Sequence, residues 1–292
     1  MMLPLIAIQP PDLCEALTSP HWFADKYIIM LILSFPLLFF VSAPYGKLKQ
    51  STWTFDVDPR LGWFIMEAPA WITYLAITFT ALPQVLTRFQ QSYETYSIPD
   101  PSTGSTILPP QLNLYMVVFF VSAILYNGHY IYRSSIYPFL THSSKSMDLV
   151  PVLCASVFNF SNGLIQSYNI LCTQPKDLNS MSFLYFTFGL VGFMLAWFGC
   201  FYSDSYLISL RQHRKGTQYV IPTAGLFQFT YSANYLCEFI QWVCFAVLTQ
   251  NSYSGWLFVF LTFSNLYPRA VKYRQFYLQM AKEKESASIQ AI

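Results

Sequence analysis

The sequence predicts an all-α, polytopic membrane protein with about seven transmembrane helices around a cavity open to the cytosol. Hydrophobic residues make up 54% of the 292-residue chain, whereas charged residues make up only 10%. A soluble domain carries roughly 25% charged residues. A membrane-spanning helix needs about 20 mainly apolar residues, and several segments reach this length. Long unbroken apolar runs also argue against a membrane β-barrel, whose strands alternate in polarity.

Seven apolar segments are predicted to span the membrane as helices, because lipid offers no partners for backbone polar groups. They are 27–43, 62–84, 112–139, 148–171, 182–210, 231–249 and 256–271. The segment 85–111 is rich in Ser, Pro and Thr, which predicts a luminal loop. We expect residues 1–292 to form a single integral membrane domain. Its parts would be an external or luminal segment 1–26, a bundle 27–271 and a cytosolic tail 272–292.

The distribution of lysine and arginine predicts the orientation of these spans. With seven spans, thirteen of the sixteen cations fall on one side of the membrane and three on the other. The thirteen are Lys47, Lys49, Arg60, Arg133, Lys145, Arg211, Arg214, Lys215, Arg269, Lys272, Arg274, Lys282 and Lys284; the three are Lys26, Arg88 and Lys176. The C-terminus is therefore expected to be cytosolic and the N-terminus luminal or external.

Among the ionisable side chains inside predicted spans, where such groups are costly and usually line a cavity or a functional site, we single out four. They are Glu67, His129, Asp204 and Glu238. His129 shares one helix face with Tyr126, Tyr130 and Arg133, because helical neighbours recur at intervals of three and four residues. His129 alone is also typical of a satisfied contact between helices. The two glutamates favour a functional interpretation, because a carboxylate in an apolar span is rarely structural.

Three further polar faces converge on the basic, cytosolic side. Asp204 and Arg211 are seven residues apart, and Asn234 precedes Glu238 by four. Arg269, Tyr273 and Tyr277 recur every four residues along the last helix. This arrangement suits an anionic ligand that arrives from the cytosol. The arginines would also serve as positive-inside anchors, the tyrosines as an aromatic belt, and Asn234 as a contact between helices.

Motifs of soluble enzymes are absent from the sequence. It contains no GxGxxG, GxxxxGK[ST], HExxH or GxSxG, so any nucleotide would be bound without a Rossmann turn. No histidine pair has ligand spacing, so no metal is expected, and the net charge of +2 gives no indication of nucleic-acid binding. The remaining classes are a membrane enzyme with a cytosolic anionic cofactor and a proton-coupled transporter in which Glu67, Asp204 and Glu238 relay protons. A non-catalytic lipid-binding scaffold is a third, less favoured class.

Several motifs occur in the order found in the steroid 5α-reductase family. They are GWFIMEAPAW, HYIYRSSIYP, NGLIQSY, YSDSYLISLR, YVIPTAGLFQFTYSANYLCEFIQW and PRAVKYRQFYLQM. Together they cover about residues 44–281, and the C-terminal third is the most similar. The sequence thus resembles this family of membrane reductases, which also includes polyprenol and enoyl-thioester reductases.

The resemblance implies an enzyme that uses NADPH to saturate an enone, with seven helices around a cavity that takes cofactor from the cytosol and lipid substrate from the bilayer. Glu67 and Tyr130 match the pair that hydrogen-bonds the substrate's C3 carbonyl. The implied cofactor contacts are Asp204, Arg211, Tyr219, Asn234, Glu238, Arg269, Tyr273 and Tyr277. A 3-oxo-Δ4-steroid is the preferred substrate, and an enoyl-CoA or polyprenol reductase is the alternative. The implied membrane is the endoplasmic reticulum in a eukaryote or the inner membrane in a bacterium.

Three positions depart from the family pattern. Cys200 replaces the asparagine that is common four residues before the aspartate, so one cofactor hydrogen bond is in question. Tyr273 stands where the human steroid enzymes have histidine, and Met66 where they have glutamine.

The chemistry of enone reduction explains why an acid would lie in an apolar span. Hydride attack on the β-carbon places negative charge on the carbonyl oxygen, and hydrogen-bond donors in a dry cavity stabilise that charge. A carboxyl donates only while it holds its proton, and an apolar surrounding disfavours its charged form. We therefore expect Glu67 to act as a protonated donor beside Tyr130, which would also relay a proton toward the α-carbon.

Overall fold

The computed structural model describes residues 55–96, 98–99, 106–107, 110–141, 146–172, 180–212, 219–250 and 253–290. The described chain is almost entirely helical, which confirms the predicted all-α class. Its long helices are α4 (Pro59–Tyr96), α5 (Pro110–Ile131), α7 (Leu149–Cys172), α8 (Ser180–Gln212), α9 (Ala233–Leu248) and α10 (Tyr253–Gln290). A π-helical turn, η2 (Tyr132–Ile136), and the short α6 (Tyr137–Leu140) continue α5, and a 3₁₀ turn, η4 (Gly225–Gln228), precedes α9.

Four of the described helical segments are long and apolar enough to cross a membrane. They are Pro59–Glu94, Asn113–Leu140, Leu149–Leu171 and Met181–Gln212, and α9 is a shorter apolar helix. The predicted spans 231–249 and 256–271 coincide with α9 and with the first half of α10. The predicted span 27–43 lies outside the described residues. The membrane character is thus confirmed, and the number of seven spans stays a prediction.

The predicted loop 85–111 is wrong over its first part. Helix α4 continues to Tyr96, a short antiparallel pair joins β2 (Ile98–Pro99) to β3 (Thr106–Ile107), and α5 begins at Pro110. No proline or glycine occurs between Pro83 and Pro99, so nothing in the chain interrupts the helix there. The Ser and Pro residues that suggested a loop are concentrated after residue 96.

The start of α4 is fixed beside the start of α7. Asp58 Oδ1 accepts hydrogen bonds from the backbone N–H groups of Arg60 and Leu61, at 2.9 and 3.1 Å, and thus caps the helix that Pro59 begins. Strand β1 (Asp56–Val57) pairs antiparallel with β4 (Met147–Asp148), which leads directly into α7. The two helices therefore begin at the same end of the bundle and run side by side.

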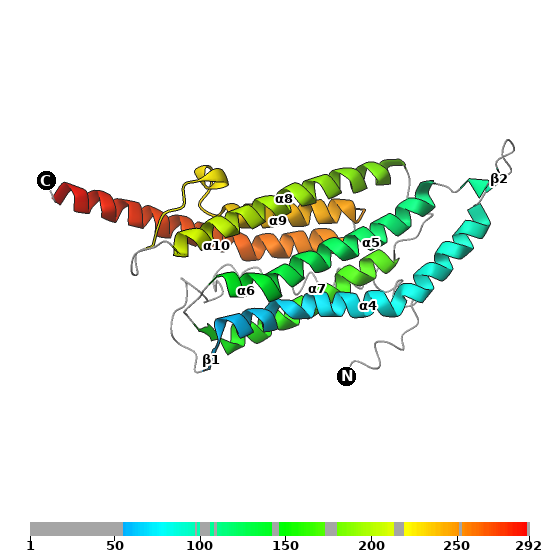
Figure 1. Ribbon diagram of the computed structural model, residues 1–292, viewed down its shortest axis with the longest axis horizontal. Helices are drawn as coiled ribbons and strands as arrows, with labels where there is room; N and C mark the ends of the chain where they lie inside the picture. Colours follow the sequence, from blue (N-terminus) through cyan, green and yellow to red (C-terminus); the bar gives the residue numbers. More distant parts are fainter. Residues whose placement is uncertain are drawn as a thin grey trace.

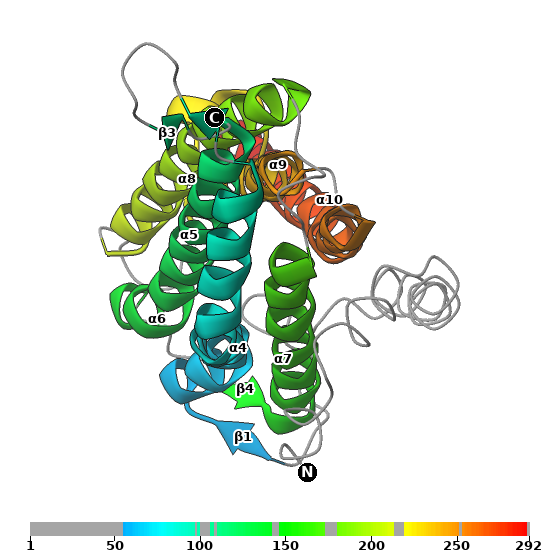
Figure 2. The ribbon, with the colours of Figure 1, turned by 90° about the vertical axis from the view of Figure 1, so that its right-hand side faces the viewer.

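The helices form two groups of three. Helices α4 and α7 pack on each other, with α5 against α4, while α8 and α9 pack on each other, with α10 against α9. Figure 1 shows α8, α9 and α10 along one side of the molecule and α4, α5 and α7 along the other, and Figure 2 shows the same arrangement along the bundle. We call these the α8–α10 half and the α4–α7 half.

Glycines allow the closest approaches within each half. A Cβ on Gly163 of α7 would collide with the Ala70 carbonyl oxygen of α4. A Cβ on Gly189 of α8 would lie 2.5 Å from the backbone nitrogen of Leu248 in α9. Small residues at such contacts are typical of membrane helices, in which close packing replaces the hydrophobic effect between helices.

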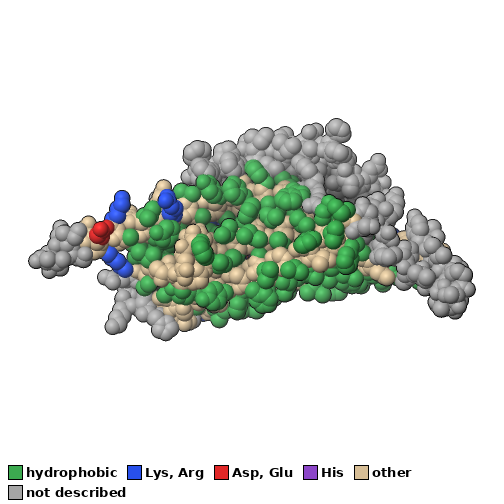
Figure 3. All heavy atoms as spheres, turned by 90° about the horizontal axis from the view of Figure 1, so that it is seen from above, with side chains coloured by type: hydrophobic (Ala, Val, Ile, Leu, Met, Phe, Trp, Pro, Cys, Tyr) green, Lys and Arg blue, Asp and Glu red, His purple; other side chains and the backbone are tan. Residues whose placement is uncertain are grey.

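The outer surface is apolar, as expected of a protein in lipid. Large side chains such as Phe79, Ile124, Phe188 and Leu195 are 68–72% exposed. In the view of Figure 3, hydrophobic side chains cover the middle of the molecule, while the Lys, Arg, Asp and Glu side chains gather near the C-terminal end of α10. An apolar band of this kind is typical of helices in lipid.

Candidate functional site

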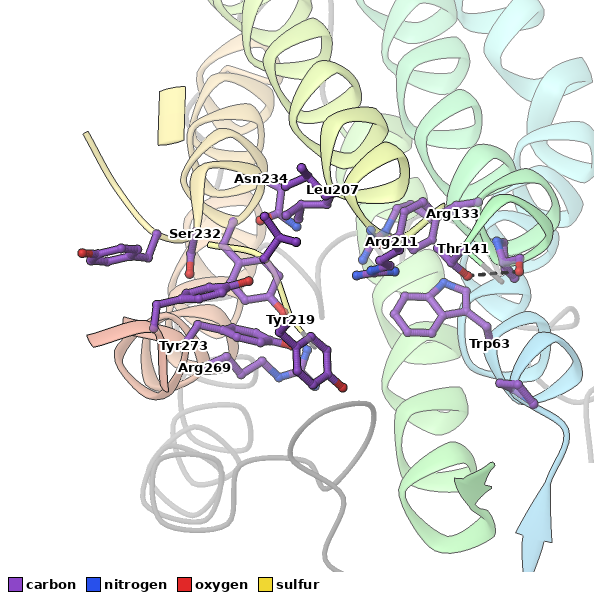
Figure 4. Close-up of a pocket in the computed structure, with 18 of the residues that line it drawn as sticks. Trp63, Arg133, Thr141, Leu207, Arg211, Tyr219, Ser232, Asn234, Arg269 and Tyr273 are labelled. Carbon is purple, nitrogen blue, oxygen red and sulfur yellow. Dashed lines mark hydrogen bonds between the residues drawn. The ribbon is translucent and has the colours of Figure 1, made fainter. Parts of the chain in front are cut away.

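A pocket opens between the two halves, at the end of the bundle where α6 and the last turn of α8 lie. Its walls come from α4, from η2, α6 and β4, from the end of α8, from the segment 219–232, and from helices α9 and α10. Six of the eight predicted cofactor-binding residues line it: Arg211, Tyr219, Asn234, Arg269, Tyr273 and Tyr277. Figure 4 shows Arg211 and Arg133 on one side of this pocket, and Arg269, Tyr273 and Tyr219 on the other.

The pocket is basic and aromatic. Arg133, Arg211 and Arg269 contribute guanidinium groups, which pair with phosphate through two parallel hydrogen bonds. Burial raises the pKa of Tyr277 to about 12, so its hydroxyl stays neutral beside an anionic ligand. The hydroxyl of Ser232 is buried in the wall without a hydrogen-bond partner among the described residues. These residues fit a cofactor that carries phosphates. Its other polar groups would be bound by the Ser232 hydroxyl and the Asn234 amide.

Arg133 lines the pocket and also joins the two halves of the bundle. Its Nη1 lies 3.7 Å from Asp204 Oδ2 of α8, and its Nη2 lies 3.8 Å from Glu238 Oε2 of α9. The guanidinium also lies over the rings of Trp63 and Tyr137, 5.3 and 5.0 Å from their centroids. Arg133 belongs to the π-helical turn η2, and such turns change the direction of side chains at functional sites.

Asp204 lies behind the pocket wall rather than in it. Its carboxylate side chain is fully buried, accepts a hydrogen bond from Asn234 Nδ2 at 3.0 Å, and has Cys200 Sγ 4.0 Å away. Asn234 itself lines the pocket. Asp204 and Glu238 therefore hold Asn234 and Arg133 in place, whereas the other six predicted cofactor residues face the pocket.

The predicted catalytic pair, Glu67 and Tyr130, lies next to the pocket but does not line it. Glu67 is half-buried and Tyr130 is buried, and the two groups lie close enough to interact electrostatically. Trp63 stands one helical turn before Glu67, and Arg133 one turn after Tyr130, and both line the pocket. Glu67 and Tyr130 thus each lie one helical turn from a residue of the pocket wall.

Two asparagines of α7 contact this pair. Asn162 Nδ2 lies 2.9 Å from the Tyr130 hydroxyl oxygen, and Asn159 Nδ2 lies 3.5 Å from Glu67 Oε2. Both asparagines are 5% exposed, and their spacing of three residues puts them on one face of α7. Glu67, Tyr130 and these two amides form a polar cluster inside the α4–α7 half.

Several known proteins are similar to this sequence. The family model for 3-oxo-5-alpha-steroid 4-dehydrogenase matches residues 145–287, which include α7 to α9 and most of α10. The chain is 29% identical over 265 residues to "Steroid 5-alpha-reductase DET2" of Arabidopsis thaliana, covering 88% of each chain. It is 28% identical over 246 residues to "3-oxo-5-alpha-steroid 4-dehydrogenase 1" of Bos taurus, covering 84% of this chain and 85% of the relative.

The chain is therefore similar to members of the steroid 5α-reductase family. This similarity and the apolar helices support the character of a membrane oxidoreductase of steroid metabolism. The matched segment 145–287 supplies Arg211, Asn234, Arg269 and the other pocket residues of the α8–α10 half. The roles assigned to individual side chains remain predictions.

The sequence alone did not assign four residues of the site. Asn159 and Asn162 are given no role by the sequence analysis, although buried amides in a membrane helix indicate partners. Arg133 is placed on the helix face of Tyr130 by its spacing but is given no role in the site, and Trp63 is not singled out. The spacing of Trp63 and Glu67 by four residues, and of Tyr130 and Arg133 by three, was the signal that could have linked them to the predicted pair.

His129 is a structural contact, as its simpler interpretation predicted. Its Nδ1 lies 2.8 Å from Gln241 Nε2 of α9, and the ring packs edge-on against Trp242 at 4.8 Å. This hydrogen bond is a second polar link between the two halves.

Proposed function

We propose that this chain is an NADPH-dependent reductase that saturates the C4–C5 double bond of a 3-oxo-Δ4-steroid. The observation that carries the proposal is the position of the arginine- and tyrosine-lined pocket directly beside the Glu67–Tyr130 pair. Arg133 and Trp63 belong to both regions, since they line the pocket and lie one turn from the pair. A cofactor in the pocket and a lipid between the halves would meet at this wall.

The pocket residues would bind the cofactor from the side that carries most of the cations. Arg211 and Arg269 would pair with phosphates, and the tyrosines of α10 would pack against rings. Asn234, oriented by Asp204, and Ser232 would hydrogen-bond the polar groups that enter the pocket. When bound, NADPH would supply the hydride.

Glu67 and Tyr130 would act at the carbonyl end of the enone, where they would stabilise the negative charge of the transition state. The ketone oxygen gains negative charge as the β-carbon is attacked, and donors aimed at it lower the barrier. Tyr130 would donate from a buried phenol, and Glu67 would donate from a protonated carboxyl. Tyr130 would also relay the proton that the α-carbon finally takes.

The arrangement in the membrane belongs to the same proposal. Residues 1–292 would form one integral domain, with a luminal or external N-terminus, a cytosolic C-terminus and the pocket facing the cytosol. Six cations lie toward one end of the bundle: Arg211, Arg269, Lys272, Arg274, Lys282 and Lys284. Arg88 instead lies in the later part of α4 and donates a hydrogen bond to the Leu171 carbonyl near the end of α7. This asymmetry supports the orientation through the positive-inside rule. In a eukaryote the membrane would be that of the endoplasmic reticulum.

The test is turnover by the purified protein in detergent. NADPH would be offered with Δ4-3-ketosteroids, enoyl-CoAs and polyprenals, and loss of absorbance at the nicotinamide band would be followed while products are identified. We expect a 5α-reduced 3-ketosteroid. Turnover of enoyl-CoAs or polyprenals alone would show that the protein is instead an enoyl-CoA or polyprenol reductase. Proton-driven uptake in liposomes without NADPH oxidation would replace the enzyme by a transporter.

A further inference from the structure

Asn162 makes two hydrogen bonds that restrict what two buried phenols can do. Its Nδ2 donates to the Tyr126 hydroxyl oxygen at 2.8 Å and to the Tyr130 hydroxyl oxygen at 2.9 Å. An amide nitrogen carries two hydrogens and accepts nothing. Both hydrogens are therefore used, and each phenol oxygen receives one of them.

The direction of these bonds determines where the tyrosine protons point. A phenol that accepts from an amide keeps its own hydrogen for a different partner. The hydrogen of Tyr130 is therefore available to a partner other than Asn162.

Packing leaves rotation of the O–H bond as the main freedom of Tyr130. Its ring lies 4.8 Å from the ring of Tyr126 and 5.7 Å from that of Trp242, and the side chain is only 4% exposed. Tyr126 is stacked on Tyr74 with 4.5 Å between ring centroids and is fully buried. Because the rings are fixed, the amide of Asn162 decides the direction of the Tyr130 hydrogen.

We infer that Asn162 is a positioning residue that keeps Tyr130 as a hydrogen-bond donor toward the substrate carbonyl. The inference rests on the proposed function, in which Tyr130 donates to a ketone oxygen. Asn159, one turn earlier on the same face of α7, supports Glu67 in a similar way. Its Nδ2 donates to the Met66 carbonyl at 2.7 Å and lies 3.5 Å from Glu67 Oε2. Donors on α7 thus leave the protons of both groups free to point away from α7.

The variant that tests this is Asn162→Leu, which removes both donors at nearly constant volume. We expect kcat with a Δ4-3-ketosteroid to fall about tenfold or more. The Kd of NADPH should stay within about twofold, because Asn162 does not line the pocket. Asn127→Leu is the matched control, since the amide of Asn127 donates only within its own helix, to the Ala123 carbonyl at 2.7 Å.

A double-mutant cycle separates positioning from a general structural role. If Asn162 acts through Tyr130, the Asn162→Leu change should cost little further kcat in a Tyr130→Phe background. The cost of Asn127→Leu should instead be the same in both backgrounds. Additive losses for Asn162→Leu and Tyr130→Phe, or an unchanged kcat for Asn162→Leu alone, would overturn the inference while the reductase activity stood. A wild-type protein without reductase activity would remove the proposed function, and the inference with it.

Discussion

The Nη2 of Arg133 lies 3.8 Å from Glu238 Oε2, so the π-helical turn after α5 is tied to α9 across the boundary between the two halves. The same guanidinium reaches Asp204 of α8. The side chains of the three residues are 12%, 13% and 0% exposed, so the group is largely shielded from water.

Removing this cation is expected to destabilise the fold. In Arg133→Met, two carboxylates would remain close together without a positive charge, at a cost of about 3–5 kcal/mol. The apparent melting temperature in detergent measures the effect. The double variant Arg133→Met/Asp204→Asn should recover part of the loss, because it removes one of the two uncompensated charges. Equal melting temperatures for Arg133→Met and wild type would show that the ion pairs contribute nothing.

Glu67→Gln is expected to reduce turnover without affecting the cofactor. An amide N–H is a weaker donor than a carboxyl O–H, so kcat should fall about 100-fold if Glu67 stabilises the oxygen charge. The Kd of NADPH should change little, because Glu67 does not line the pocket. Stopped-flow turnover and fluorescence titration with NADPH measure the two quantities. Undiminished kcat would exclude a donor role for Glu67.

Arg211→Ala is expected to weaken cofactor binding. Hydrogen bonds to a charged group contribute about 1.5–3 kcal/mol, so the Kd of NADPH should rise roughly 10- to 100-fold. The salt dependence of Kd should also decrease, since one phosphate contact is lost. Arg274→Ala is the matched control, because Arg274 is exposed on α10 and does not line the pocket. Equal Kd values for the two variants would contradict the assignment of Arg211.

The glycine contact between α8 and α9 makes a separate prediction about stability. In Gly189→Ala the new methyl group would meet the backbone of Leu248 and Cys244 at 2.5 and 2.7 Å, so the helices must separate. We expect a loss of about 1–3 kcal/mol. Gly128→Ala meets nothing within 4 Å and should stabilise α5 by up to about 1 kcal/mol. Thermal unfolding of both variants in one detergent compares them directly, and the opposite order would contradict the close packing.

Much of the fold was predictable because lipid restricts the chain to apolar helices. Six of the expected spans coincide with described helices, since each carries a long apolar run without a proline cluster. The end of α4 was not predictable from composition, because the polar stretch up to Tyr96 continues a helix beyond its apolar part. Helical spacing also grouped Arg269, Tyr273 and Tyr277 correctly, and all three line the pocket.

The less predictable part of the site is the contact between segments far apart in sequence. Periodicity within α7 places Asn159 and Asn162 on one face but cannot say that this face meets Glu67 and Tyr130. That pairing depends on β1 and β4, which align α4 with α7, and on Gly163, which allows their close approach. Likewise, no local pattern indicated that Asp204 and Glu238 share Arg133.

The glycine contacts have a consequence for how the molecule can move. They join backbones inside each half, whereas Trp242 crosses the boundary by packing its large ring against Tyr126, Tyr130 and His129. Sliding α8 along α9 would force main chain against main chain. Swinging one half away from the other needs side-chain rotation, the release of Arg133 from its two acids and the loss of the His129–Gln241 hydrogen bond. Hinge-like breathing between the halves is therefore the low-cost motion of this scaffold, and it would widen the space at Glu67 and Tyr130.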